Sequence, residues 1–513
     1  MMKDNGTREP MALEIAPIAN RRMHWLRVGL WGLVAFVLVA PTIQAQWETA
    51  RRHHARGAAT GPQDRQGPGK EAKGALTRWR TAVEEFWTPG KNIYDMPPRD
   101  PSLRTHQRSS LHPNMPFTVI LLTPFARMPV WAMVLTWNLL KIVAVAASLF
   151  MLARVVSHGA TRVPDWVMLL AFAWAAPMIA GDFQHGNTNC FVLAAIVLHL
   201  WLYRKGADYL AGAPLALAVC LKMTPVLFLL YWIYQRNVRL LVGTLMALAL
   251  FVGVIPQAAL GPTRAAELTV TWWHNLIRPG LVEGRAYPIH INQSIPGLFQ
   301  RLLIGPPQKE GDISWNSDDD PYYLRRARRD KEAPESQWIA LVNLSPAQAR
   351  QVIRAAQLAI VLLGLWGVGW RSPARDDARR GLHYALIVTG MMLLNQRTWE
   401  HHGPVMLVAG AGVWYALAAG NPAPRARAWA FWLMIVAGVS SWLNRGDFFK
   451  AAGALMGYGA DAGERWGNVY SAYGPLCVHL LLVFVAALIL SVSLRKSPAP
   501  YRAIGSAGEP AAR

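Results

Sequence analysis

Charged residues are scarce in this sequence, and acidic residues are the scarcer kind. Charged side chains make up 16% of the 513 residues, 30 acidic against 52 basic, whereas 53% of the residues are hydrophobic. Ordinary soluble domains carry roughly a quarter charged residues. The composition therefore excludes a single ordinary soluble domain and favours a polytopic membrane protein.

Cysteine is also scarce, and no basic domain stands apart from the rest of the chain. The three cysteines, Cys190, Cys220 and Cys477, lie in or beside apolar runs, without a CxxC pair or a histidine at ligand spacing, which excludes a disulfide framework and a zinc site of that kind. Lys and Arg are scattered through short loops, so the net charge of +22 predicts contact with anionic lipid and no nucleic-acid partner.

Long apolar runs are what the sequence has in abundance. A hydrocarbon core of about 30 Å needs roughly 20 apolar residues in a helix. The first run follows Arg21 and Arg22 and is interpreted as a retained signal anchor. The runs predict membrane helices at 25–45, 129–153, 164–181, 189–203, 238–260, 353–370, 381–395, 404–419, 427–443 and 474–494.

One further apolar segment, 209–234, does not fit a topology in which successive loops alternate between the two sides of the membrane. It lies between two basic loops, YRKGAD and QRNVR, which both favour the cytoplasm. Pro225 removes a backbone donor and disfavours helix before it. We therefore predict a re-entrant hairpin broken at Lys222–Pro225.

The resulting topology has about 10–12 membrane segments in an all-α bundle. It predicts a cytoplasmic tail at 1–22, a membrane domain at 23–494 and a second cytoplasmic tail at 495–513. Within the domain, 46–116 and 261–350 are expected to be long extracytoplasmic loops. No duplicated half with matching broken helices is visible, which argues against an inverted-repeat transporter.

The stretch NQRTWEHHGP, residues 395–404, places three ionisable groups at the start of a membrane helix. Glu400 there is suited to helix capping. His401 and His402 are suited to accepting a proton from a hydroxyl or pairing with an anion. Metal ligation would need a third ligand that the sequence does not identify.

Lys222 is the second unusual group, because an ammonium deep in a membrane usually faces protein, water or an anion. Two interpretations remain open. The side chain either extends to the interface or neutralises a phosphate at the helix break.

Three further segments carry hydrogen-bonding side chains in apolar surroundings. Asp182, Asn187 and Asn189 in GDFQHGNTN suit either a tight turn or sugar hydroxyls. Asn292 and Gln293 in AYPIHINQSIPGLFQRLL suit sugar hydroxyls or an interfacial helix. Asp95 is a candidate general base, a sugar ligand or the turn residue before two prolines.

The ordered set of these segments, over about residues 25–420, resembles glycosyltransferase family 87, which includes polyprenyl-phosphate-mannose-dependent mannosyltransferases and related arabinofuranosyltransferases. The resemblance rests on KNIYD with the following PFTVILLTPFARMPVWAMVLTWNLL, GDFQHGNTNCFVLAAIVLHLW, YLAGAPLALAVCLKMTPVLFLLYWIYQRNVR, NQSIPGLFQR and NQRTWEHHGPVMLVAGA. It implies a GT-C fold, a helical membrane bundle whose extracytoplasmic loops bind a lipid-linked sugar. Family members commonly carry an acidic residue just after the first span; here the region reads EAKGALTRWRTAVEEFW, and Glu71 is the nearest upstream acid.

The function predicted from the sequence is transfer of a mannose-like hexose or arabinofuranose from a polyprenyl-phosphate donor to a hydroxyl of an envelope glycan or glycolipid, at the outer face of a bacterial inner membrane. No cofactor is required; a divalent metal is compatible with the fold class but not indicated. A polyprenyl-lipid or solute transporter or flippase, or an inactive relative, remain the alternatives.

The candidate site residues fall into three groups. The catalytic candidates are His402, His401, Glu400, Glu71 and Asp95, the donor-phosphate candidates are Lys222 and Arg397, and the sugar or acceptor candidates are Asn292, Gln293, Trp399, Asp182, Asn187 and Asn189.

Overall fold

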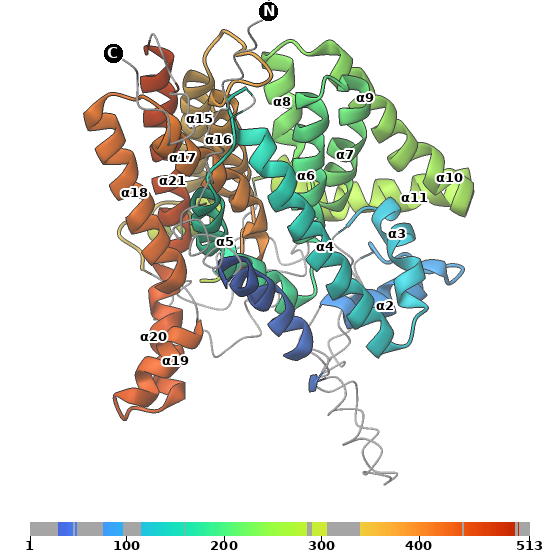
Figure 1. Ribbon diagram of the computed structural model, residues 1–513. Helices are drawn as coiled ribbons and strands as arrows, with labels where there is room; N and C mark the ends of the chain where they lie inside the picture. The colour runs from blue at the N-terminus through green and yellow to red at the C-terminus, as the bar shows by residue number, and fades with distance from the viewer. Residues whose placement is uncertain are drawn as a thin grey trace, which may run out of the picture.

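The described part of the protein is a bundle of helices (Figure 1). The computed structural model describes residues 29–44, 47–48, 75–95, 114–159, 161–284, 290–304, 339–443, 446–497 and 501. Within these residues the only extended pairing is an isolated bridge between Gly420 and Tyr501. The predicted all-α class is confirmed, whereas the two predicted cytoplasmic tails lie almost entirely outside the described residues.

The helices follow the apolar runs closely. After a helix at Gly29–Gln44, the chain order is α2 (Ala75–Trp87), α3 (Pro116–Ala126), α4 (Val130–Val156), α5 (Asp165–His185), α6 (Asn189–Arg204), α7 (Asp208–Leu221), α8 (Val226–Tyr234), α9 (Val238–Leu248), η2 (Ala249–Val254), α10 (Ile255–Leu260), α11 (Pro262–Trp272), η3 (Trp273–Ile277), α12 (Arg278–Leu281), α13 (Ile295–Leu303), α15 (Pro346–Val368), α16 (Arg379–Leu394), η5 (Glu400–Val405), α17 (Met406–Ala419), α18 (Pro424–Leu443), α19 (Gly446–Leu455), α20 (Ala460–Ala472) and α21 (Pro475–Arg495).

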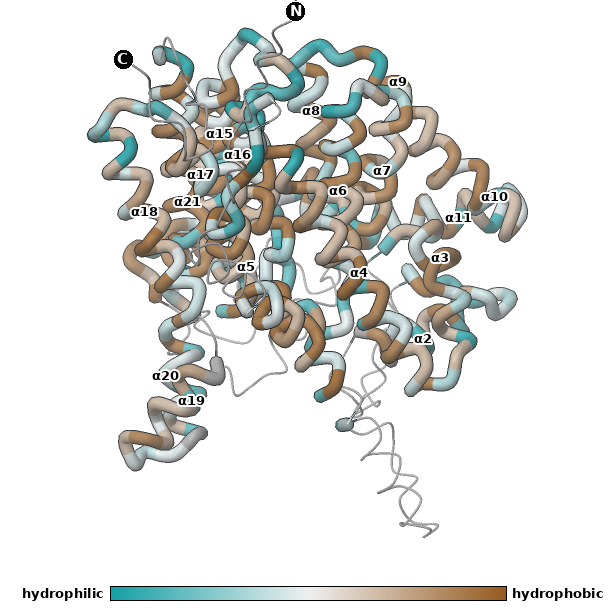
Figure 2. The backbone as a smooth tube through the Cα atoms, viewed as in Figure 1, coloured by the Kyte–Doolittle hydropathy of each residue, from teal (hydrophilic) through white to brown (hydrophobic). Residues whose placement is uncertain are grey.

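Seven helices in the described residues are long and apolar enough to cross a bilayer. They are α4, α5, the continuous run Val238–Leu260, α15, the run Glu400–Ala419, α18 and α21. Four shorter apolar helices, Gly29–Gln44, α3, α6 and α7, accompany them. Figure 2 shows hydrophobic residues along α9, α10 and α18, and hydrophilic residues in the loop between α8 and α9.

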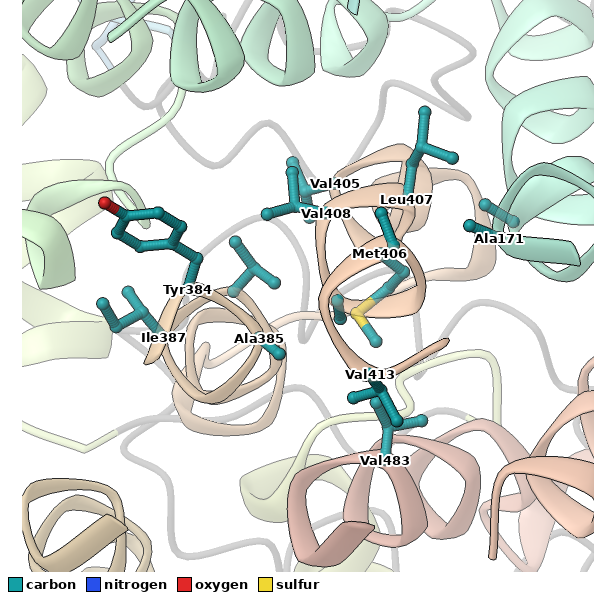
Figure 3. Packing of buried hydrophobic residues seen from close by; sticks show 14 of the residues in the cluster. Ala171, Tyr384, Ala385, Ile387, Val405, Met406, Leu407, Val408, Val413 and Val483 are labelled. Carbon is teal, nitrogen blue, oxygen red and sulfur yellow. The ribbon is translucent and has the colours of Figure 1, made fainter. Parts of the chain in front are cut away.

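The centre of the bundle is α17, which lies between α16 and α5 (Figure 3). Its Val413 lies next to Val483 of α21 (Figure 3). A Cβ on Gly412 would meet the carbonyl oxygen of Gly381 at 2.3 Å, so α16 and α17 touch through their backbones. Small residues allow such close packing where lipid supplies no hydrophobic drive between helices.

The predicted break in segment 209–234 is confirmed. α7 ends at Leu221, Lys222 is extended at φ −161° and ψ 127°, and α8 begins at Val226. Apart from its break, the segment is helical on both sides, as its apolar composition predicted.

The two ends of this broken segment meet the same loop, 371–380. At the start of α7, Asp208 Oδ2 accepts a 2.7 Å hydrogen bond from Arg375. At the end of α8, the Tyr231 hydroxyl accepts a 3.0 Å hydrogen bond from Arg380. The start of α7 and the end of α8 therefore lie at the same level of the bundle. The segment folds back on itself, as the predicted hairpin requires.

Both stretches expected to be long loops contain helices. Helix α2 lies within 46–116, and α11 to α13 lie within 261–350. Helices α19 and α20 occupy most of the connection between the spans predicted at 427–443 and 474–494. In α2 the buried residues Leu76, Trp79, Val83 and Phe86 follow a helical period that the interpretation as loop overlooked. Figure 1 shows α19 and α20 as a hairpin projecting beyond the lower end of α18.

The hairpin makes a direct prediction for accessibility labelling in sealed vesicles. Cysteines introduced at the exposed positions Lys205 and Arg239, which flank α7 and α8, should react with an impermeant thiol reagent from the same side. A cysteine at exposed Gln184 should react from the opposite side. The three native cysteines are buried and should give little background. Labelling of positions 205 and 239 from opposite sides would contradict the hairpin.

Candidate functional site

Three segments distant in the sequence meet around the side chain of Asn189, the first residue of α6. Its Nδ2 donates to the carbonyl oxygen of His401 at 2.8 Å and to Asp182 Oδ1 at 2.9 Å. Its Oδ1 accepts a 2.8 Å hydrogen bond from Lys222 Nζ. One amide therefore joins the 182–189 turn, the break between α7 and α8, and the 395–402 loop.

Asp182 is fully buried near the end of α5 and forms an ion pair with Lys141 of α4. The distance from Lys141 Nζ to Asp182 Oδ2 is 2.8 Å, and both side chains are 0% exposed. Lys141 Nζ also donates to the Asp182 carbonyl oxygen at 2.7 Å. The backbone N–H groups of Asn189 and Cys190 donate to the carboxylate at 3.3 Å each.

These contacts change the interpretation of Asp182. Both carboxylate oxygens bind protein groups, so Asp182 stabilises the start of α6 and orients Asn189 instead of presenting an open oxygen to a sugar. A carboxylate buried in this way requires a counter-ion, because an unpaired charge in the interior is costly.

Lys222 is half-buried at the helix break. Among the described residues, the hydrogen-bonding partner of its ammonium is the neutral amide of Asn189. The break itself is held by α3, since Thr118 Oγ1 donates to the Cys220 carbonyl oxygen at 2.7 Å. The result is a cation with a fixed position and no carboxylate in direct contact within the described part of the chain.

The 395–402 loop is held by Asn292, which is 0% exposed. Asn292 Nδ2 donates to the Gln396 carbonyl oxygen at 2.9 Å, and its Oδ1 accepts from the Thr398 backbone N–H at 2.9 Å. The same oxygen accepts a 3.0 Å hydrogen bond from Ser294 Oγ. Asn292 is thus close to the predicted site, and its side chain hydrogen-bonds to the loop that carries the histidines.

Gln293 extends this support to the other side of the bundle. Its backbone N–H donates to the Thr398 carbonyl oxygen at 2.7 Å. Its side chain donates to the Ser471 carbonyl oxygen at 2.8 Å and accepts from the Leu476 N–H at 3.2 Å. These bonds connect the site loop to the junction of α20 and α21.

Aromatic and imidazole rings cluster on this loop. The Arg397 guanidinium lies 3.8 Å from the centroid of the Trp399 ring. His401 lies between the rings of Trp399 and His185, with centroid distances of 5.2 and 4.5 Å. His402 stacks on Trp399 at 5.7 Å.

The two neighbouring histidines differ in their hydrogen bonding. His402 Nδ1 accepts from the Trp399 backbone N–H at 3.3 Å, so the proton of its neutral ring resides on Nε2. No hydrogen bond within the described residues reaches the ring nitrogens of His401, which is 6% exposed. Of the two, His401 has the imidazole that is available to accept a proton.

The remaining predicted residues lie at varying distances from this cluster. Glu400 is half-buried at the first position of η5, and half-buried Asn187 donates its backbone N–H to the Asp182 carbonyl oxygen at 3.4 Å. Glu71 lies outside the described residues. Asp95 lies on the loop after α2, and no contact joins it to the histidine cluster within the described chain.

Burial raises the pKa of Asp95, and the negative charge of Glu267 raises it further. A raised pKa strengthens a carboxylate as a general base, because it brings the pKa closer to the operating pH. The catalytic roles proposed for Asp95 and Glu71 stay predictions.

Lys141 and His185 are the site residues that the sequence interpretation missed. Lys141 stands inside a predicted membrane span, where an ammonium is itself a functional signal. His185 stands in the same turn as Asp182, but its proximity to His401 depends on the packing of α5 against η5. Helix α5 approaches so closely that a Cβ on Gly403 would lie 2.2 Å from Met178 Sδ.

The metal prediction is not settled by these contacts. Among the residues that the structure describes, no group of three or more His, Cys, Asp or Glu side chains is arranged to hold a metal ion. Activity without a metal therefore stays a prediction.

Asn292→Ala should separate support of the loop from sugar binding. The substitution leaves the Gln396 carbonyl and the Thr398 N–H without their buried partner, and it should lower the free energy of unfolding by about 2 kcal/mol or more. Thermal unfolding in detergent, with half-buried Asn187→Ala as the control, measures this. If the midpoint is unchanged in Asn292→Ala, the side chain does not support the loop.

Comparison with known proteins gives a family match over part of the chain. No curated protein and no solved structure matches the sequence. Residues 114–316 match glycosyltransferase family 87. The matched region contains the Asp182–Asn189 turn, Lys222, Asn292 and Gln293, whereas Asp95 and the 395–402 loop lie outside it. The match confirms the resemblance to this family for residues 114–316, and it supports a membrane glycosyltransferase.

Proposed function

We propose that the protein transfers a sugar from a polyprenyl-phosphate donor to a hydroxyl of an envelope glycan or glycolipid, at the extracytoplasmic face of a bacterial inner membrane. The sugar is a mannose-like hexose or arabinofuranose. The observation that carries the proposal is the position of Lys222. Its ammonium is fixed beside the histidine loop, and its hydrogen-bonding partner within the described residues is a neutral amide.

A phosphate leaving group needs fixed positive charge of this kind. Arg397 supplies a second cation next to the cluster, stacked on Trp399. Lys222 and Arg397 both lie close enough to His402 for their charges to act on its ring. Preorganised positive charge stabilises a transition state in which negative charge develops on the phosphate oxygens.

The transfer step uses His401 as the base. The oxygen of the acceptor hydroxyl bonds to the anomeric carbon while the bond from that carbon to the phosphate oxygen breaks, and polyprenyl phosphate leaves. The hydroxyl proton passes to the His401 imidazole. His185, whose exposed ring lies against His401, connects this group to solvent.

The sidedness of the proposal rests on the opposite end of the bundle. Arg375, Arg380 and Arg236 gather there: the first two guanidinium groups lie 4.8 and 4.9 Å from the centroid of Tyr203, and the third lies 5.5 Å from that of Trp370. Basic loops favour the cytoplasm. The cluster around Asn189 lies at the other end of α6 and is therefore assigned to the outer face.

Lys222→Met should lower kcat/KM for the donor by about 10²-fold or more, the usual scale for the loss of one positioned charge. Steady-state transfer from a labelled polyprenyl-phosphate sugar in detergent or liposomes measures it. Lys205→Met, a matched loss of one exposed lysine at the basic end, should leave the rate unchanged. Equal rates in both variants would remove Lys222 from donor binding.

His401→Ala should lower kcat by about 10²-fold or more, because a general base contributes on that scale. His402→Ala should chiefly lower stability, since its ring bonds the Trp399 backbone. Exposed His274→Ala is the control. A larger loss of kcat in His402→Ala than in His401→Ala, with both proteins folded, would reverse the assignment. Labelled sugar or lipid crossing the bilayer without transfer would instead support the flippase alternative.

A further inference from the structure

We infer that Lys141 is a positioning residue that keeps Asp182 from competing with the donor phosphate for Lys222. The inference rests on the proposed function, because it concerns the cation assigned to the donor. Lys141 is the charged neighbour that the structure places in direct contact with the Asp182 carboxylate, at 2.8 Å and 0% exposure.

Four side chains form a series of direct contacts from Lys141 to Lys222. Lys141 contacts Asp182, Asp182 contacts Asn189, and Asn189 contacts Lys222. A single neutral amide thus separates the only carboxylate in this chain of contacts from the ammonium that would meet the donor. Asn189 offers its Nδ2 to the carboxylate and its Oδ1 to Lys222, so its two ends match the two charges.

The charges of Lys141 and Asp182 determine whether Lys222 can bind an anion. With Lys141 present, the buried pair is neutral, and the Lys222 ammonium, whose hydrogen-bonding partner is the Asn189 amide, is available to an anion. Without Lys141, Asp182 would be a buried carboxylate with no ammonium beside it, and its attraction for Lys222 would oppose phosphate binding. An opposite charge within about 4–6 Å shifts an ionic equilibrium by about tenfold or more, and here one amide side chain separates the two charged groups.

The pair also has a purely structural role, which any test must separate from this one. Lys141 donates to the Asp182 carbonyl oxygen as well as to the carboxylate, and its ammonium lies 5.3 Å from the centroid of the Phe183 ring. Loss of Lys141 therefore weakens the junction of α4 and α5 in addition to changing the charge.

The basic end of the bundle supplies a matched control. Asp208 is 5% exposed and pairs there with Arg375. Asp208→Asn breaks an ion pair at the opposite end from Lys222. It should lower the melting temperature and leave the donor KM unchanged.

The experiment measures donor KM, kcat and melting temperature in purified full-length variants, with a labelled polyprenyl-phosphate sugar and saturating acceptor. Lys141→Met should raise the donor KM about tenfold or more and change kcat less than twofold. Adding Asp182→Asn should return the KM to within about threefold of wild type, because the amide still accepts from Asn189 and no charge is left unpaired. Asp182→Asn alone, which leaves a surplus cation, should keep the KM at or below the wild-type value.

Three results would overturn the inference. They are an unchanged KM in Lys141→Met with a lowered melting temperature, as in Asp208→Asn; a KM that stays high in the double variant; or a raised KM in Asp182→Asn alone. If Lys141→Met does not fold, the donor KM of the double variant and that of Asp182→Asn still test the inference. If Lys222→Met itself leaves donor kinetics unchanged, the proposed phosphate site fails, which is a separate outcome.

Discussion

The site depends on one ion pair buried between two membrane helices. Lys141 of α4 and Asp182 of α5 are both inaccessible to solvent, and the carboxylate also receives the first N–H groups of α6. Breaking a buried pair by removing one partner typically costs about 3–5 kcal/mol, because it leaves an uncompensated charge. The fold therefore fixes α4, α5 and α6 relative to one another at the point where Asn189 begins. Through Asn189, it also fixes Lys222 and the backbone of His401.

A second constraint gives the bundle two chemically different ends. The broken helix pair α7 and α8 starts and finishes at the basic loops, so its break lies at the other end, and the lysine within the break is placed beside the histidines. Had the segment crossed the bilayer once, one of its basic loops would lie among the site residues. The break at Pro225 is thus the feature that brings a cation to the site and keeps the arginine-rich loops away from it.

The sequence predicted the bundle well because membrane helices leave a strong local signal. The spans at 129–153, 164–181 and 189–203 agree with α4, α5 and α6 to within a few residues. The break at Lys222 was predictable as well, since Pro225 and the charges of two loops point to it independently. The amphipathic helix α2 was missed, because the polar composition of its surroundings outweighed the spacing of Leu76, Trp79 and Val83.

Side-chain partners were harder to predict than helices. Lys141 and Asp182 are 41 positions apart, and their contact depends on how α4 and α5 pack. For the same reason the hydrogen bonds from the Asn292 amide to the loop that carries the histidines could not be predicted, and sugar binding by Asn292 stays a prediction.

Sugar transfer by this protein can be measured by following one label through one reaction. Purified protein in nanodiscs receives a polyprenyl-phosphate sugar labelled in the sugar, together with envelope glycan and glycolipid as acceptor, and the products are separated by mass. Label should move to an acceptor hydroxyl while one polyprenyl phosphate appears for each sugar transferred, and Lys222→Met should slow both by about 10²-fold or more. Donor that remains intact with wild-type protein, across mannose-like and arabinofuranose donors, would contradict the proposed function.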